Sequence, residues 1–309
     1  MEEALIDDQH VAETTETSHR WWTIGLSEMV PQGEPVAVRC DTTELVCFRE
    51  IDGTVRSLVD QCAHRRAPLS LGKIGEDGMI ECPYHGWQYN GGTGRCVKIP
   101  NLSSTERVPG TYRVPVFSTL ERDGFIHIWS GDGEEPIGEL PSLALSKLDT
   151  ENIDSRLLAF PKDALIDLLL DAPGAVLDLG RLRIINEHRF GDPVLADNVI
   201  TVLYAVVDET VEPGVLVSEY PFQLEIKLDL MSNAATVRLI EDSGTLIANA
   251  VITVLSVKNV LCTLALRGSH VLNAESGSPH KIGLNEAIDP QVALEAVDYV
   301  SRLRKNLPE

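Results

Sequence analysis

Short runs of apolar and β-branched residues, separated by polar turns, fill the first part of the chain. The runs lie at 36–39, 45–49, 56–59, 79–80, 97–99 and 125–129, with glycine, proline or aspartate between them. Such runs favour strands, and the residues between them favour tight turns. Residues 90–94, Asn-Gly-Gly-Thr-Gly, have the composition of a hairpin tip that needs left-handed backbone. The pattern from Trp21 to about Ser130 therefore predicts a small all-β domain.

The second half of the chain combines helical and strand patterns. Residues 161–170 predict a helix, and residues 199–271, rich in Val, Ile and Thr, predict strands. Residues 290–307 predict a closing helix, because Asp289 suits its N-cap, Pro290 suits its first position and apolar residues recur along one face. We therefore expect an α+β fold, in which an all-β domain precedes an antiparallel sheet with helices packed on it.

Changes in composition divide the chain into three parts. Residues 1–18 are polar and acidic, so we expect a disordered tail. Residues 131–136, Gly-Asp-Gly-Glu-Glu-Pro, form a polar break between the β pattern and the mixed pattern. We therefore expect a β domain over 19–132 and a second domain over 133–309.

The charge of the chain argues against several classes of partner. Among 309 residues, 26 Lys and Arg stand against 47 Asp and Glu, which gives a formal net charge of −21. A surface of this sign repels nucleic acid and anionic membranes. The chain opens with acidic residues where a secretory signal would be positive, and its most apolar stretch, 247–266, is interrupted by Asn249, Lys258 and Asn259. We expect paired strands in that stretch, no membrane span and a cytoplasmic location.

Two arms that each combine a cysteine with a histidine form the most specific motif. Cys62-Ala63-His64 precedes Cys82-Pro83-Tyr84-His85, with 17 residues between the two. The chain has six cysteines, too few for a disulfide scaffold of this length, and a reducing compartment keeps them as thiols. Each arm can therefore offer one thiolate and one imidazole to a metal. A zinc site remains open, although zinc fingers usually pair like residues within an arm.

Mixed arms fit a two-iron cluster better than a single zinc. In a Rieske [2Fe-2S] cluster two cysteines hold one iron and two histidines hold the other, so each arm spans both metals. The flanking residues fit a rigid cage, since Pro83 stiffens the loop, Gly86 allows a tight turn and Trp87 can shield the cluster from water. The predicted cluster ligands are Cys62, His64, Cys82 and His85.

Residues 21–132, with Cys-Ala-His-Arg from Cys62 and Cys-Pro-Tyr-His-Gly-Trp from Cys82, resemble the Rieske domain of Rieske non-heme iron oxygenase α subunits. A weaker similarity to the aryl O-demethylase branch continues to the closing helix. The resemblance implies a cluster that receives electrons from a reductase or ferredoxin and passes them to a mononuclear iron in the neighbouring subunit of a trimeric ring. In that family the iron activates dioxygen to hydroxylate or dealkylate a small molecule.

The chain departs from this family at the mononuclear iron site. The family holds that iron with two histidines and a carboxylate, and the histidines follow an aspartate in a D-x2-H-x4-H pattern. Asp171 falls on this aspartate, which implies a role in electron relay, but Gly174 and Leu179 stand where the two histidines are expected. No pair with H-x4-H spacing occurs among the eight histidines, which are His10, His19, His64, His85, His127, His188, His270 and His280. We therefore expect the mononuclear iron to be absent.

Other residues offer a non-standard ligand set. Asp178, His188 and Asp289 are candidates together with Asp171, although a helix terminus explains Asp171 and an N-cap explains Asp289. A single histidine between charged neighbours, such as His188, is more often structural. The second domain, about 175 residues long, is also short for the family. We therefore expect a reduced substrate pocket.

Positive charge gathers around the two arms. From residue 56 to residue 98, six positive side chains face four negative ones on a chain that is strongly acidic overall. This contrast would steer an acidic redox partner toward the cluster, and chance placement on a solvated face is the alternative. The positive residues are Arg56, Arg65, Arg66, Lys73, Arg95 and Lys98, and the negative ones are Asp60, Glu76, Asp77 and Glu81.

Three functions follow from these features. The favoured one is a Rieske [2Fe-2S] electron-transfer and accessory subunit, which relays electrons from a reductase or ferredoxin to the iron of a homologous catalytic subunit. The opposing one is an active mono- or dioxygenase whose iron has non-standard ligands, which would bind ferrous iron more weakly than two imidazoles do. The third is a standalone electron carrier whose second domain serves oligomerisation.

Overall fold

The computed structural model describes residues 21–40, 42–103, 106–131, 151–212, 220–230, 232, 234–258, 261–270, 281–288, 292 and 300. The expected tail at 1–18, nearly all of the expected boundary at 131–136, and Asp289 lie outside these residues. Of the expected closing helix only Val292 and Val300 are described. Both are helical and pack against the core of the second domain.

Three small antiparallel sheets build the N-terminal part of the molecule. The predicted strands are confirmed to within two residues at each end, and strand β11, Phe125–Trp129, is as predicted. One sheet has the order β1-β11-β10, with β1 over Trp21–Leu26 and β10 over Thr119–Arg122. The second has the order β2-β3-β4-β9, formed by Val36–Cys40, Thr43–Arg49, Val55–Val59 and Val116–Phe117. The third has the order β5-β6-β7-β8, formed by Lys73–Ile74, Ile80–Glu81, Gln88–Tyr89 and Cys96–Lys98.

The predicted hairpin tip at 90–94 joins β7 to β8. Gly94 alone among these five residues has a left-handed backbone, with φ of 65°. Its backbone also passes so close to the neighbouring chain that an added Cβ would lie 2.0 Å from the Val114 carbonyl oxygen. Glycine at this position is therefore required both by conformation and by space.

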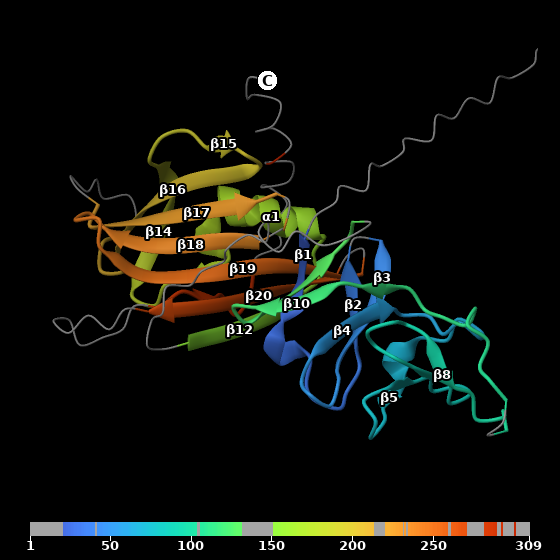
Figure 1. Ribbon diagram of the computed structural model, residues 1–309. Coiled ribbons are helices and arrows are strands. Elements are labelled where there is room, and N and C mark those ends of the chain that lie inside the picture. Colours follow the sequence, from blue (N-terminus) through green and yellow to red (C-terminus); the bar gives the residue numbers. More distant parts are fainter. Residues whose placement is uncertain are drawn as a thin grey trace, which may run out of the picture.

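The C-terminal part is one large antiparallel sheet with a helix on one face, so the expected α+β fold is confirmed. The eight strands run in the order β12-β20-β19-β18-β17-β16-β14, with β15 paired to β16. Figure 1 shows this sheet on the left, β5 and β8 at the lower right, and β1, β2 and β4 between them. In chain order the strands are β12 Glu151–Leu158, β14 Leu182–Arg189, β15 Val194–Ala196, β16 Val199–Asp208, β17 Phe222–Asp229, β18 Ala234–Glu241, β19 Leu246–Lys258 and β20 Leu261–His270.

The apolar stretch at 247–266 forms two paired strands, as predicted. β19 and β20 run antiparallel, with Ile252 opposite Leu266 and Val254 opposite Leu264. Within the described part of the chain, no helix has the length and apolar character needed to cross a membrane. The most hydrophobic segment is therefore accounted for by the centre of a sheet.

The helix packs its apolar face on the large sheet. It spans Lys162–Asp171, one residue from the predicted bounds, and Leu165, Leu168 and Leu169 are buried against the sheet. In β17 the burial alternates, so that Leu224 and Ile226 face the same core. The remaining elements are a two-stranded sheet, β13 Leu177–Asp178 with β21 Gly283–Leu284, and 3₁₀ turns at Ser27–Met29, Leu69–Leu71 and Pro173–Ala175.

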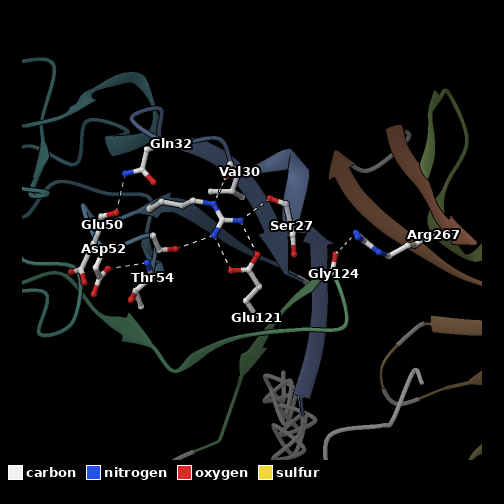
Figure 2. Close-up of polar contacts among 11 residues, drawn as sticks. Ser27, Val30, Gln32, Glu50, Asp52, Thr54, Glu121, Gly124 and Arg267 are labelled. Carbon is white, nitrogen blue, oxygen red and sulfur yellow. Dashed lines mark hydrogen bonds and ion pairs between the residues drawn. The ribbon is translucent and has the colours of Figure 1, made fainter. Parts of the chain in front are cut away.

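Arg49, the last residue of β3, ties four segments of the N-terminal part together. Its Nε donates to the Val30 carbonyl oxygen at 2.7 Å, and Nη2 donates to that of Ser27 at 2.8 Å. Nη1 donates to the Gly53 carbonyl at 3.0 Å, and each Nη atom lies 2.8 Å from a different oxygen of the Glu121 carboxylate. Figure 2 labels three of these partners, Val30, Ser27 and Glu121. The hydrogen bond with Glu121 raises the pKa of Arg49, so the charge is firmly held.

A second arginine joins the N-terminal part to the large sheet. Arg267, on β20, is nearly buried, and its Nη1 donates to Glu28 Oε1 at 2.7 Å and to the Gly124 carbonyl oxygen at 3.3 Å. Figure 2 shows Arg267 reaching toward Gly124. An apolar cluster that spans the same junction contains Leu26, Phe125, Ala234, Val251, Leu255 and Ala265. The junction therefore combines a charged contact with a shared core.

Substitution of Arg49 by alanine should lower the free energy of unfolding by about 3 kcal/mol, because three carbonyl groups and a carboxylate lose their donor. Arg122→Ala is the control, since Arg122 lies half-exposed and pairs only loosely with Asp123 at 3.7 Å. The control should cost less than about 0.5 kcal/mol. Denaturant unfolding of the two variants would measure the difference, and equal losses would contradict the proposed importance of the Arg49 contacts.

His127, on β11, is a buried imidazole that stays neutral. Its Nδ1 lies 3.1 Å from the Thr23 hydroxyl oxygen, directly across the β1–β11 pair. Burial lowers the pKa of His127 to about 4. In the unfolded chain this histidine takes up a proton near pH 6.5. Its contribution to stability is therefore complete above that pH and is lost as the pH falls toward 4.

Acidification from pH 7 to pH 5 should cost about 2 kcal/mol of stability through this one residue. The measurement is the free energy of unfolding at both pH values for the native chain and for His127→Gln, which keeps a hydrogen-bonding side chain but does not titrate. We expect a smaller loss in the variant. The same loss in both proteins would show that His127 is not responsible.

Candidate iron–sulfur centre

The first arm lies in the loop between β4 and β5. The Cys62 amide donates to the Ala67 carbonyl oxygen at 2.9 Å, and the Arg66 amide donates to the Cys62 carbonyl oxygen at 2.8 Å. Arg66 is left-handed, with φ of 58°, which is uncommon for a residue other than glycine. These bonds fold the arm into a closed turn that holds Cys62 and His64 in place.

The second arm, between β6 and β7, repeats this backbone pattern. The Cys82 amide donates to the Trp87 carbonyl oxygen at 2.8 Å, and the Gly86 amide donates to the Cys82 carbonyl oxygen at 3.1 Å. Gly86 has φ of 68°, and an added Cβ would lie 3.0 Å from Pro100 Cγ. In both arms the fourth residue after the cysteine is left-handed. The predicted tight turn at Gly86 is confirmed, and Arg66 takes the equivalent place in the first arm.

The two arms place their sulfur and nitrogen atoms at different depths. Cys62 and Cys82 are each 2% exposed and belong to the same buried cluster. His64 and His85 lie at the surface, with ring centroids 4.7 Å apart. The donors are thus arranged as a buried sulfur pair and an exposed nitrogen pair.

This arrangement of sulfur and nitrogen donors fits a two-iron cluster. In the described part of the chain, no three His, Cys, Asp or Glu side chains are close enough to bind one metal ion. A tetrahedral zinc would need four donors around one point. A Rieske cluster needs two sulfurs on one iron and two nitrogens on the other, which is how the four side chains are grouped.

Tyr89 lies behind the sulfur pair. Its hydroxyl oxygen is 3.0 Å from Cys62 Sγ and accepts the Ala63 amide at 3.1 Å. The ring is fully buried, and burial raises the pKa of Tyr89 well above its ordinary value, so the phenol keeps its proton and can donate it toward a thiolate. Sequence reasoning did not find Tyr89, because the contact spans 27 residues and no local pattern marks it.

Cys82 has donors of its own. Burial raises the pKa of this thiol, while hydrogen bonds from the backbone amides of Tyr84 and His85 act in the opposite direction. Such amides stabilise the thiolate that a metal requires. Cys96 lies in the same buried cluster as Cys62 and Cys82 but belongs to neither arm, and burial raises its pKa to about 11.

Aromatic rings support the two imidazoles. Trp87 stacks on His64 with a centroid distance of 4.7 Å and an interplanar angle of 2°, and Tyr112 packs edge-on against Trp87. Tyr84 lies against His85 at 3.9 Å. Desolvation by the neighbouring side chains, together with the charges of His85 and Arg65, lowers the pKa of His64, which favours the neutral form that binds metals. Trp87 therefore contacts the histidine of the first arm directly, and its shielding of the cluster from water stays a prediction.

The ends of the first arm are fixed by Asp60 and Gly72. The Asp60 carboxylate accepts the Ser70 amide at 2.8 Å and the Ser70 hydroxyl at 2.6 Å, which closes the loop at its base. At Gly72 an added Cβ would lie 2.0 Å from the Glu81 carbonyl oxygen, so the loop passes directly over β6. Asp60 is only 7% exposed, so it closes the loop and does not belong to the predicted surface charges.

Four of the six positive side chains around the arms fall into two groups. Arg56 pairs with Glu50 at 3.0 Å, and Lys73 pairs with Glu81 at 3.2 Å. Arg65 and Arg66 are exposed directly beside His64. The charge next to the nitrogen pair is therefore positive, which matches the predicted surface for an acidic partner.

Comparison with known proteins identifies the N-terminal part of the chain. Residues 20–117 match the model of the Rieske [2Fe-2S] domain. They form a Rieske domain. The two arms and the four predicted ligands lie inside this match.

The curated relatives share this domain and little more. The protein TIC 55 of Arabidopsis thaliana is 33% identical over 119 residues, 38% of this chain and 22% of its own length. Chlorophyllide a oxygenase of Chlamydomonas reinhardtii is 40% identical over 124 residues, 40% of this chain and 18% of its length. The oxygenase component of dicamba O-demethylase from Stenotrophomonas maltophilia is 38% identical over 112 residues, 36% of this chain and 32% of its length. The chain matches less than a third of each.

Solved structures extend the likeness to both parts of the chain. Dicamba monooxygenase covers 95% of this chain and 91% of its own, with a TM-score of 0.65 and 21% identity. NdmA of Pseudomonas putida, solved with caffeine, covers 93% and 90%, with a TM-score of 0.60 and 18% identity. At this identity the likeness shows the fold: a Rieske domain followed by the large antiparallel sheet domain of an oxygenase.

The second domain places no imidazole at the two expected iron-ligand positions. Gly174 lies in a 3₁₀ turn, where its amide donates to Asn186 Oδ1 at 3.0 Å and its carbonyl oxygen accepts Asn285 Nδ2 at 3.1 Å. A Cβ at this position would lie 3.0 Å from the Asn186 side chain. Leu179 is buried in the core. Neither residue offers a donor side chain, and two amides hold the backbone at Gly174.

The alternative ligands form no group of three donors within the described residues. Asp171 ends the helix half-buried, and the Tyr204 hydroxyl lies within 2.9 Å of the Leu170 and Asp171 carbonyl oxygens. Asp178 is exposed on β13, and His188 lies among Phe190 and Tyr220. None of these belongs to a group of three donors within the described residues, and Asp289 lies outside them. Cavities of about 620 Å³ and 470 Å³ are present, and neither is lined by Asp171, Gly174 or Leu179.

Substitution of Cys82 by serine should remove the visible absorption of the purified protein, because one iron loses a thiolate. Cys96→Ser is the matched control, since Cys96 is a buried thiol in the same cluster of residues but lies in neither arm. We expect the control to keep the spectrum. Absorption spectra at matched protein concentration would compare the variants, and an unchanged spectrum in Cys82→Ser would refute the ligand assignment.

Proposed function

We propose that this chain is the electron-transfer and accessory subunit of a Rieske oxygenase system. One observation carries the proposal: the Rieske domain contains all four predicted ligand side chains, whereas the second domain has Gly174 and Leu179 at the expected iron-ligand positions. The chain would accept electrons from a reductase or ferredoxin and deliver them to the mononuclear iron of a homologous catalytic subunit.

The residues of the Rieske domain support the electron-transfer half of the proposal. When bound, a Rieske cluster supplies reversible one-electron transfer. Cys62 and Cys82 would hold it from inside the domain, and His64 and His85 would hold it at the surface. Tyr89 donates toward the sulfur side and Trp87 shields His64. An exposed nitrogen side gives a partner a short path to the cluster.

Charge supports the class of donor. Arg65 and Arg66 lie beside His64 on a chain of net charge −21, so an acidic ferredoxin or reductase would be drawn to this face and repelled elsewhere. The encounter would be transient, because steering by charge raises the association rate more than the affinity. High salt should accordingly slow reduction of the cluster.

The accessory half of the proposal rests on the second domain. It keeps the oxygenase fold and the Asp171 position at the end of the helix, where the Tyr204 hydroxyl contacts the last carbonyl groups. We propose that this domain builds a trimeric ring with a catalytic subunit and that Asp171 contributes to electron relay across the subunit boundary. Gly174 and Leu179 provide no ligand, so no step of oxygen chemistry is assigned to this chain.

Iron and acid-labile sulfide should each be present at about two per chain after reconstitution under reducing conditions. Addition of ferrous iron should not raise the iron content further, and the protein alone should consume no oxygen when reduced. Co-expression with a homologue that contains an intact D-x2-H-x4-H motif should yield a mixed complex with activity. A third, tightly bound iron together with oxygen consumption by the isolated chain would favour the alternative of an active oxygenase with non-standard ligands.

A further inference from the structure

A cavity of about 470 Å³ opens where the Rieske domain meets the large sheet. Ala37, Val38 and Leu71 line it from the Rieske domain, and Leu255 and Thr263 line it from β19 and β20. We call it the seam cavity. Its size falls within the range of small-molecule sites, and junctions between domains are a preferred place for such sites. It is separate from both arms of the iron–sulfur centre and from the Gly174 region.

The walls of the seam cavity are mainly apolar. Ile24 and Leu255 are almost completely buried, whereas Leu71 is 72% exposed although it borders the cavity. Met29 and Val38 complete the same surface. An exposed leucine on a concave apolar surface gains from a ligand that removes it from water, at about 25 cal/mol per Å² of apolar area.

The charged side chains of the cavity determine the sign of its charge. Glu44 and Asp60 provide two carboxylates, and Arg39, opposite Glu44 in the β2–β3 pair, provides one guanidinium. Asp60 accepts two hydrogen bonds from Ser70 and, as a carboxylate, has acceptor capacity left. The charged side chains that line the cavity therefore carry a net negative charge, which favours a cationic or hydrogen-bond-donating group over an anionic one.

We propose that the seam cavity binds a small amphipathic molecule that has an apolar ring and a positively charged amine. The ring would lie between Leu71 and Leu255, and the amine would face Glu44 and Asp60. The site goes beyond the electron-transfer function, because nothing in that function requires a second small-molecule ligand.

A ligand in the seam cavity would affect the cluster through the first arm. Asp60 and Pro68 precede and follow the residues that carry Cys62 and His64, and both line the cavity. A ligand there would also contact both domains, so it would stabilise their junction together with the Arg267–Glu28 pair. One ligand would therefore affect both the loop of the first arm and the junction between the two domains.

Three probes with one ring and different head groups test the proposal: 1-naphthylmethylamine, 1-naphthalenemethanol and 1-naphthoic acid, titrated by calorimetry into the cluster-loaded full chain. We expect the amine to bind about tenfold more tightly than the acid, with the alcohol between them. Glu44→Gln should reduce the advantage of the amine over the alcohol and leave the alcohol unchanged. Equal affinity for the three probes would overturn the assignment.

Variants that change the walls of the seam cavity test whether the amine binds there. Ala37→Trp places an indole in the cavity wall and should weaken the amine at least about tenfold. Leu71→Ala, at the exposed rim, removes apolar surface that the ring would contact and should also weaken binding of the amine, so it gives a second test that does not depend on how Ala37→Trp folds. Val194→Trp is the matched control, because Val194 is 57% exposed on β15 and does not line the cavity. Undiminished binding in both cavity variants, or equal weakening in the control, would refute the site.

Discussion

The candidate iron–sulfur centre depends on two short loops that fix the positions of its predicted ligands. Each loop has a left-handed residue four positions after a cysteine. In each loop the amide of that left-handed residue donates to the cysteine carbonyl oxygen, and the cysteine amide donates to the residue five positions on. This geometry turns the cysteine inward and leaves the histidine at the surface. Arg66 and Gly86 meet the same requirement with different side chains, and only glycine does so without steric cost.

The domain around these loops is fixed by a small number of long-range contacts. Arg49 joins β3 to β10 and to the turn that contains Ser27. The next residue in that turn, Glu28, pairs with Arg267 on β20. A continuous set of charged contacts therefore connects the Rieske domain to the large sheet, and the seam cavity lies at the same junction. Rigidity near the cluster suits electron transfer, because a fixed ligand set changes little when the charge of the cluster changes.

Local sequence pattern predicted much of this structure. Strand runs, the hairpin tip, the helix before Asp171 and the pairing of β19 with β20 all depend on neighbours in the chain, and each was found where its pattern lies. Cys62 and Cys82 come together as predicted, and Trp87 covers His64. The four-ligand assignment itself stays a prediction until the metal is measured.

Contacts between distant residues could not be predicted in this way. Three hydrogen bonds join ordinary polar residues to partners that are 10 to 111 positions away in the chain. They are Tyr89 with Cys62, Ser70 with Asp60, and Asn285 with the Gly174 carbonyl oxygen. Neither hydrophobic period nor motif spacing identifies such pairs. The left-handed conformation of Arg66 could not be predicted either, because no local pattern indicates it. The structure explains it, since Arg66 occupies the same position in the first loop as Gly86 in the second.

The central claim, that two sulfurs hold one iron and two imidazole nitrogens hold the other, is tested most directly by electron–nuclear double resonance on the reduced protein labelled with ¹⁵N-histidine. The claim predicts two coupled histidine nitrogens in the native chain and the loss of this pattern in His85→Cys. A reduced cluster without histidine coupling, or zinc in place of iron at the two arms, would contradict it.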